Sequence, residues 1–374
     1  MSLYNSTTSN RIPYWDNLKG ILIIFVVFGH FLWGYKESTY TLFTECVCFI
    51  YLFHMPAFLF VSGYFSRSPN SLKLQSITKL LIAFLLLNFL MMPYAVLVEH
   101  MRLSITSLYY SSWYLWALVV YRITLPLMSR IPYIVPISIL VSLSIGFWKE
   151  FDGVFAISKI IALYPFFISG AKSSTEGMES FIYFLKRKRF WVWLLIILIG
   201  ALSLYTIHMG IIGMYDIRYA AYTRKLEIFK RFFIFSVAAA FICGLLSLTA
   251  KDITPFINKW GKNSLSLYAT HRIFTLIFLL VFPITTVDSI YWIWIFVGTV
   301  VVLVTLGSDY VSYKFNVFLS FFLDSYFQKE EFKHRSVRVV GALSIPCMIL
   351  GVIFIKGIPL RYMELIKSFL LGLN

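Results

Sequence analysis

The chain has 374 residues, of which 59% are hydrophobic and only 13% are charged. A soluble domain carries about twice that charged fraction, so the composition excludes an ordinary soluble protein. The net charge of +16 fits a membrane protein whose Lys and Arg side chains gather in cytoplasmic loops better than a nucleic-acid-binding protein. The cysteines form no CxxC pair, so we expect neither a disulfide framework nor a bound metal.

Apolar runs near the length of a membrane span recur along the whole sequence, so we predict an all-α, polytopic transmembrane bundle of about 10–11 helices. The predicted spans are 18–36, 43–65, 77–98, 108–128, 131–148, 155–171, 188–208, 231–250, 264–284, 289–308 and 337–355. We expect a single integral-membrane domain over residues 1–374, with the first run retained rather than cleaved as a signal peptide. The stretch 313–327 is short and contains Asp324, so it is predicted to lie in the membrane interface as an amphipathic helix.

The basic side chains of the predicted loops place the N-terminus in the cytoplasm. Under that orientation most Lys and Arg residues of the loops fall on the inner side, as the positive-inside rule requires. The exception is the outward loop 209–231, which is rich in Tyr and Arg. Two interpretations of this loop stay open, a solvated surface loop and a lid over an outward-facing cavity.

Polar side chains inside the apolar runs are the candidates for a functional site, because burying them in a membrane is costly. Lys19 and His30 are eleven residues apart, so they share one face of the first helix, roughly 16 Å apart along its axis. His54 on the second helix and His271 on a late helix fall at a comparable depth. One buried histidine is usually structural, whereas three at one depth predict a shared polar cavity. Neutral imidazole can also accept a proton from a hydroxyl group.

The remaining polar groups admit simpler explanations. Lys19 lies at the inner end of its helix, where a phosphate-bearing donor would arrive, but it could also be a lysine that extends to the membrane interface. His100 and His334 lie in predicted loops, and His208 lies near the outer end of its helix. These three histidines are therefore weaker candidates.

Three segments carry a resemblance to a known family. WDNLKGILIIFVVFGH has a basic residue, ten further residues and a histidine; FHMPAFLFVSGYFSR ends in Ser-Gly-aromatic; WGKNSLSLYATH begins with Gly-x-x-Ser and ends in histidine. In these features the chain resembles the acyltransferase 3 family of integral membrane acyltransferases, especially its short members that modify cell-surface sugars. The basic residue of the first motif is usually arginine. Lys19 keeps the charge but cannot form a bidentate phosphate contact.

The resemblance implies an O-acyltransferase that moves an acyl group, most often acetyl, from cytoplasmic acetyl-CoA to a hydroxyl of a surface polysaccharide or lipid-linked glycan precursor. It implies His30 as general base or transient acyl carrier, His54 and His271 as groups that orient it or the acceptor, and Lys19 and Arg67 as contacts for the donor's phosphates. It further implies a multi-pass protein of the cytoplasmic membrane, whose partners are the lipid bilayer and the glycan acceptor, with no nucleic acid. The family often carries a C-terminal esterase-like domain, which we do not expect here.

A multi-helix transporter or flippase of a glycolipid or polysaccharide intermediate remains the alternative. It would also need many helices around a polar cavity. Such proteins typically show inverted repeats and paired broken helices, and no internal repeat stands out in this sequence.

Overall fold

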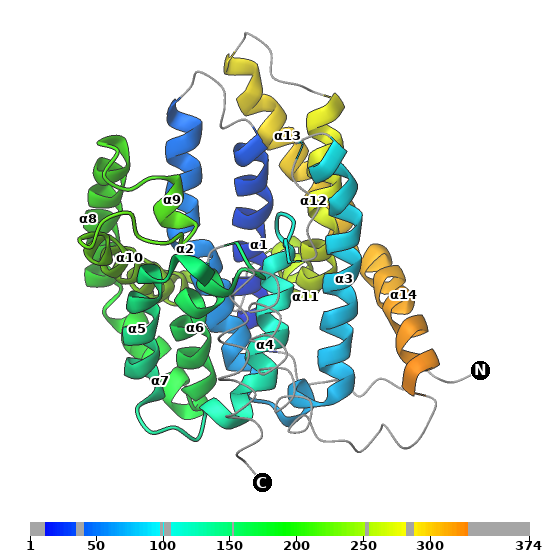
Figure 1. Cartoon of the computed structure of the whole chain (residues 1–374), viewed down its shortest axis with the longest axis horizontal. Coiled ribbons are helices and arrows are strands. Elements are labelled where there is room, and N and C mark those ends of the chain that lie inside the picture. The colour runs from blue at the N-terminus through cyan, green and yellow to red at the C-terminus, as the bar shows by residue number, and fades with distance from the viewer. Residues whose placement is uncertain are drawn as a thin grey trace, which may run out of the picture.

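The computed structural model describes residues 12–34, 41–97, 100, 106–151, 153–250, 254–281 and 288–327. Over these ranges the regular structure is entirely helical (Figure 1). The longer helices are α1 (Pro13–Gly34), α2 (Thr41–Ser66), α3 (Leu74–Leu97), α8 (Arg189–His208), α10 (Glu227–Leu248), α13 (Asp288–Leu306) and α14 (Asp309–Phe327). The shorter ones are α4 (Ser112–Met128), α5 (Ile134–Ser144), α6 (Ile157–Lys172), α7 (Thr175–Arg187), α9 (Met214–Ile217), α11 (Pro255–Lys262) and α12 (Ser264–Val281). Short 3₁₀ helices cover Pro69–Leu72, Ile145–Phe147 and Lys149–Phe151.

Five described helices, α1, α2, α3, α8 and α10, are long and apolar enough to cross a membrane. The pair α13 and α14 adds a sixth span if the two are counted together, although they are bent by 61° at their junction. These helices confirm the all-α polytopic bundle. The predicted interfacial segment 313–327 belongs to α14, and the predicted span 337–355 lies outside the described residues.

Several short elements differ from the predicted spans. The spans predicted over 131–148 and 155–171 are too long, because α5 has 11 residues and α6 has 16, whereas a single crossing needs about 20. Both helices begin after a residue with left-handed backbone, Tyr133 and Ala156. Hydropathy reports the apolar composition of such a run but not a break in the chain. Helices α7 and α11 were not predicted, since both are amphipathic and too short to span.

The first two helices form the centre of the bundle. The apolar window of α2 is 72% buried and that of α1 is 56% buried, against 22% for α8, which lies at one edge in Figure 1. Many side chains of α8 therefore face outward, where a bilayer would cover them. We call "inner" the end of the bundle where α1 begins and α2 ends; it is the cytoplasmic end under the predicted orientation.

Glycines bring two helix pairs into backbone contact. Gly63 of α2 lies against a carbonyl oxygen of α6, and Gly170 of α6 lies against one of α2. Gly20 of α1 and Gly261 of α11 make the same reciprocal contact. A Cβ atom at any of these positions would collide with main chain, so only glycine allows this close approach. The two contacts hold α2 against α6 and α1 against α11.

Candidate functional site

A cavity of about 340 Å³ lies toward the outer end of the bundle. We call it the outer cavity; its described lining includes His30, Tyr51, His54, Tyr268 and Arg272. Side chains from α1, α2 and α12 form its floor, and residues at the starts of α4 and α6 form part of its wall. Two of the three predicted histidines therefore share one cavity.

His30 is the half-buried histidine of the cluster, near the outer end of α1. Its Nδ1 atom lies 3.3 Å from the hydroxyl oxygen of Tyr51. Its ring centroid lies 5.1 Å from that of His271. The ring of Tyr51 also packs edge-on against His54, with 4.7 Å between centroids. Tyr51 thus stands between His30 and His54, and the structure brings all three histidines together.

The rings of His54 and His271 are each hydrogen-bonded to a backbone carbonyl of their own helix. Nδ1 of His54 lies 2.8 Å from the carbonyl oxygen of Ile50, and Nδ1 of His271 lies 2.7 Å from that of Tyr268. A carbonyl only accepts, so Nδ1 donates in both, and in a neutral ring Nε2 keeps its lone pair. His271 is fully buried, and its Nε2 has no hydrogen-bond partner among the described residues. It does not line the outer cavity and instead lies behind His30.

Arg272 is a site residue that the sequence interpretation missed. Its Nη1 donates to the backbone oxygen of His30 at 3.3 Å, and its guanidinium lies over the ring of Tyr110, 4.9 Å from the centroid. The residue is 2% exposed. The signal that singled out Lys19, a charge within an apolar run, also applies to Arg272 and could have found it.

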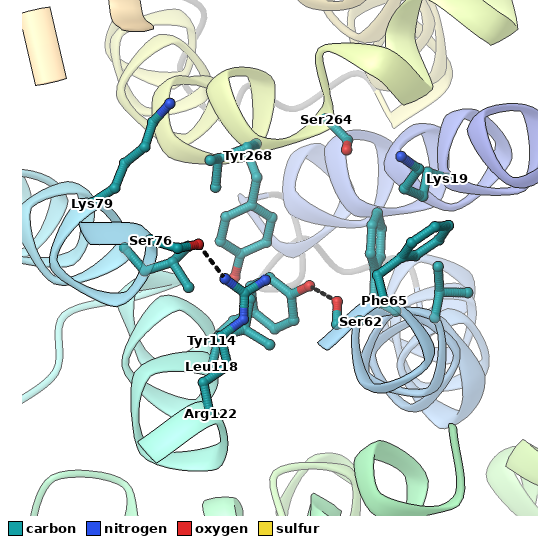
Figure 2. Close-up of a pocket in the computed structure, with 14 residues that line it drawn as sticks. Lys19, Ser62, Phe65, Ser76, Lys79, Tyr114, Leu118, Arg122, Ser264 and Tyr268 are labelled. Carbon is teal, nitrogen blue, oxygen red and sulfur yellow. Dashed lines mark hydrogen bonds between the residues drawn. The ribbon is translucent and has the colours of Figure 1, made fainter. Parts of the chain in front are cut away.

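A second cavity of about 360 Å³, the inner cavity, is lined toward the inner end by Lys19, Lys79 and Arg122 (Figure 2). The two lysines lie on opposite sides of it, with Arg122 between them. These are the charged residues among its described lining, and all three are cationic. The cavity is therefore suited to a ligand with negative charge.

Each of these cations is held by a neighbour. Lys19 Nζ lies 2.6 Å from Oδ1 of Asp16, one turn earlier in α1. Lys79 Nζ donates to Oδ1 of Asn316 at 2.7 Å, and Arg122 Nη1 donates to Oγ of Ser76 at 3.2 Å. Lys19 thus lies where the sequence predicted, whereas Lys79 and Arg122 were not singled out.

Arg67 is the predicted donor contact that lies apart from the other site residues. It is not among the described residues that line the inner cavity. Its guanidinium donates to the backbone oxygen of Ser173 and to Oγ1 of Thr175, the latter at 2.7 Å, and it stacks on Tyr64 at 4.2 Å. In this structure it ties the end of α2 to the start of α7.

Tyr268 is common to the described linings of both cavities. Its hydroxyl donates to the backbone oxygen of Ser111 at 2.7 Å. Its ring packs against Tyr114 at 4.7 Å, and the Tyr114 hydroxyl is 2.8 Å from Oγ of Ser62 (Figure 2). The side chain is 3% exposed. The Tyr268 ring therefore lies between the two cavities, and its centroid is 5.5 Å from that of His271.

Comparison with protein families identifies the chain. The family model Acyl_transf_3, described as an acyltransferase domain, matches residues 12–308. The chain belongs to the acyltransferase 3 family. Searches of curated proteins and of solved structures each return no match. The family and the apolar helices together make the protein a multi-pass membrane acyltransferase, and the matched range contains every residue that lines the two cavities.

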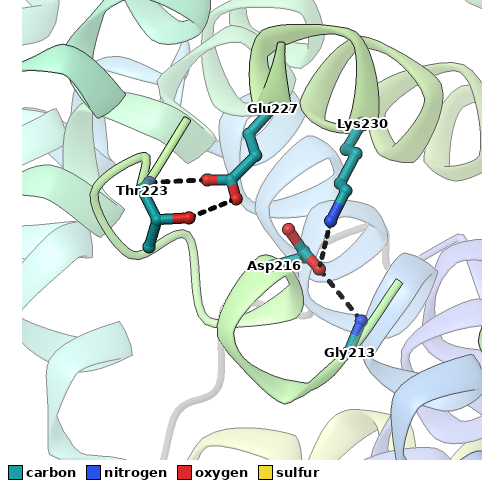
Figure 3. A network of polar contacts seen from close by, with 5 residues as sticks. All are labelled: Gly213, Asp216, Thr223, Glu227 and Lys230. Carbon is teal, nitrogen blue, oxygen red and sulfur yellow. Dashed lines mark hydrogen bonds and ion pairs between the residues drawn. The ribbon is translucent and has the colours of Figure 1, made fainter. Parts of the chain in front are cut away.

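In this acyltransferase the outward loop reaches the outer cavity. Arg218 and Tyr219, which follow α9 directly, belong to the cavity lining. The loop is held by Asp216, whose Oδ2 accepts from the backbone N–H of Gly213 at 2.9 Å and lies 3.8 Å from Nζ of Lys230 (Figure 3). Of the two interpretations of loop 209–231, this contact favours a cover over the cavity.

Proposed function

We propose that this membrane acyltransferase is an O-acetyltransferase of the cytoplasmic membrane. It takes acetyl from cytoplasmic acetyl-CoA and passes it to a hydroxyl of a cell-surface polysaccharide or lipid-linked glycan precursor. One observation carries the proposal: the two cavities approach from opposite ends of the bundle and adjoin at Tyr268, beside the histidine cluster. An enzyme that joins a donor from one face to an acceptor from the other needs such an arrangement.

The inner cavity suits the donor. Coenzyme A carries several phosphate negative charges, and the three charged lining residues Lys19, Lys79 and Arg122 are all cationic. Arginine can bind a phosphate with two parallel N–H groups, whereas lysine binds it as a point charge. With phosphates held there, the thioester end of the donor would extend along the cavity toward Tyr268. Lys19 stands where the family usually has arginine and cannot form a bidentate phosphate contact. Arg122, which lines the same cavity, can form one.

The outer cavity suits the acceptor. In the proposed step His30 takes the proton of the acceptor hydroxyl while the hydroxyl oxygen attacks the thioester carbonyl carbon. The carbon–sulfur bond breaks, and the coenzyme A thiolate leaves and is protonated. Tyr51 and His271 contact the His30 ring and position it. His54, on the next helix, donates through Nδ1 to Ile50, which leaves the Nε2 lone pair of the neutral ring able to accept a hydrogen bond from the acceptor. A route in which His30 carries the acetyl group transiently has the same products.

The test uses purified protein in sealed vesicles with one defined orientation. Acetyl-CoA labelled in the acetyl group is supplied only at the inner face, and an oligosaccharide acceptor only at the outer face. We expect label in the acceptor, and no transfer when the two faces are exchanged. Movement of a glycan across the vesicle without label transfer would instead support the flippase. Rapid quenching before acceptor is added separates the two chemical routes, because only a carrier histidine becomes labelled.

A further inference from the structure

The outer cavity continues sideways into a second cleft. This cleft, about 320 Å³ in volume, shares Leu108, Lys159, Arg218 and Tyr219 with the outer cavity. The two spaces therefore adjoin along these four residues, and we call them together the acceptor groove. A site for one hydroxyl group does not need this additional space. The groove can hold sugar units next to the one that reacts.

The charged side chains along the acceptor groove have one sign. Among the described residues of its two linings they are Lys159, Arg218 and Arg272, with no Asp or Glu. Two acidic residues of the neighbouring loop and helix, Asp216 and Glu227, do not line the groove and bond to other groups. Asp216 holds Gly213 and Lys230, and Glu227 accepts from the backbone N–H of Thr223 at 2.7 Å (Figure 3).

Asp216 and Glu227 line a further cleft of about 280 Å³, which adjoins the groove at Tyr215 and Ala220 and is also lined by Lys230 and Arg231. The two carboxylates therefore lie beside cations of α10, whereas the exposed Arg218 lies in the lining of the groove.

The cations of the groove are combined with aromatic rings. Arg218 lies over Trp33 at 4.5 Å, and Lys159 lies over Trp113 at 4.8 Å, each measured to the ring centroid. A guanidinium stacked on a ring still has N–H groups along its edge for a carboxylate or phosphate. The aromatic rings add apolar surface on which the face of a sugar can pack. Cation and ring together suit a sugar that bears a negative group.

We propose that the acceptor is an acidic glycan. On the basis of the proposed O-acetyltransferase function, Arg218 and Lys159 bind carboxylate or phosphate groups on sugar units beside the one that is acetylated. His30 is then reached by a hydroxyl of the central unit. Arg218 acts as a specificity-determining residue, since it lies at the junction of the two parts of the groove.

The test compares three acceptors: an oligosaccharide containing uronic acid, its carboxyl-reduced neutral form, and a phosphorylated form of the neutral chain. We expect the KM of at least one acidic acceptor to be about tenfold below that of the neutral one, as for a charged hydrogen bond in a partly exposed site. The better acidic acceptor identifies the anionic group. In Arg218→Gln the preference should be lost because the KM for the acidic acceptor rises, so that the ratio of the KM values for the acidic and neutral acceptors approaches one.

Arg224→Gln is the matched control, because Arg224 is exposed on the same loop and lines neither part of the groove. It should keep the preference for acidic acceptors. Equal KM values for the acidic and neutral forms in the parent protein would overturn the acidic-glycan proposal while leaving O-acetyl transfer intact. The opposite result is that the acidic chain binds but is not acetylated. Calorimetry of its binding in the absence of donor detects this case. Binding that depends on Arg218 without any acetylation would support the groove and refute the proposed function.

Discussion

The inner and outer cavities are built from different kinds of structure. The inner cavity is lined by residues of α1, α2, α3, α4 and α12, so its walls are helical. The outer cavity draws Leu108, Tyr110, Arg218 and Tyr219 from segments between helices. Loops tolerate sequence change better than packed helices. Under the proposed function, the donor acetyl-CoA is the same in all cells and can use a fixed helical site, whereas an acceptor glycan that differs between cell surfaces is better bound by loops.

The largest expected effect is at His30 in the outer cavity. Loss of a proton-transfer group typically costs 10²–10⁴-fold in rate, so His30→Ala should abolish measurable acetyl transfer. The protein should still insert, because the side chain is only half-buried. Transfer of labelled acetyl and size-exclusion profiles in detergent measure both. Near-normal transfer by His30→Ala would remove the histidine cluster from the chemistry.

Tyr268 tests whether its ring limits the access of water where the two cavities adjoin. Tyr268→Ala removes this ring, so water from the outer cavity should reach the donor thioester more easily when no acceptor is bound. We expect a several-fold rise in acetyl-CoA hydrolysis without acceptor and a loss of transfer. Tyr268→Phe, which loses only the bond to the Ser111 oxygen, is the matched control and should hydrolyse far less. If the two variants hydrolyse the donor equally slowly, the ring is not the barrier.

Lys19 tests the charge of the inner cavity. Lys19→Ala should raise the KM for acetyl-CoA by about tenfold, as expected for one charged contact to phosphate, and leave the KM for the acceptor unchanged. Lys19→Arg should retain more activity than Lys19→Ala, because it keeps the cation. Lys19→Met controls for side-chain volume, and a thermal melt checks that Asp16 without its partner does not unfold the protein. Equal activity in the arginine and alanine variants would exclude Lys19 from the site.

Arg67 carries the smallest expected effect. Its hydrogen bonds to Ser173 and Thr175 place it outside the inner-cavity lining. Arg67→Gln should therefore change the KM for acetyl-CoA by no more than about twofold, in the range of an exposed charge contact. The measurement is donor-dependent kinetics alongside Lys19→Ala. A KM increase matching that of Lys19→Ala would show that the family resemblance assigned Arg67 correctly.

The sequence allowed us to identify the candidate site residues that are polar side chains within apolar helices. Lys19, His30, His54 and His271 were found because polar groups in apolar helices are unusual, and the structure brings the histidines together. Arg218 was not found because an arginine in an outward loop is ordinary, and its place above Trp33 depends on tertiary packing. The half-length helices were missed for a related reason, since a run of apolar residues does not reveal where its backbone turns.

The glycine contacts of α2 with α6 and of α1 with α11 bear on how a substrate could travel through the bundle. At these contacts one helix's backbone rests on the other's carbonyl oxygens. Rocking the pairs apart, as alternating-access carriers do, would give up this close packing within the hydrocarbon layer, where a lost contact is not replaced by water. The scaffold is thus better suited to remaining rigid during acyl transfer than to moving a whole substrate through the bundle.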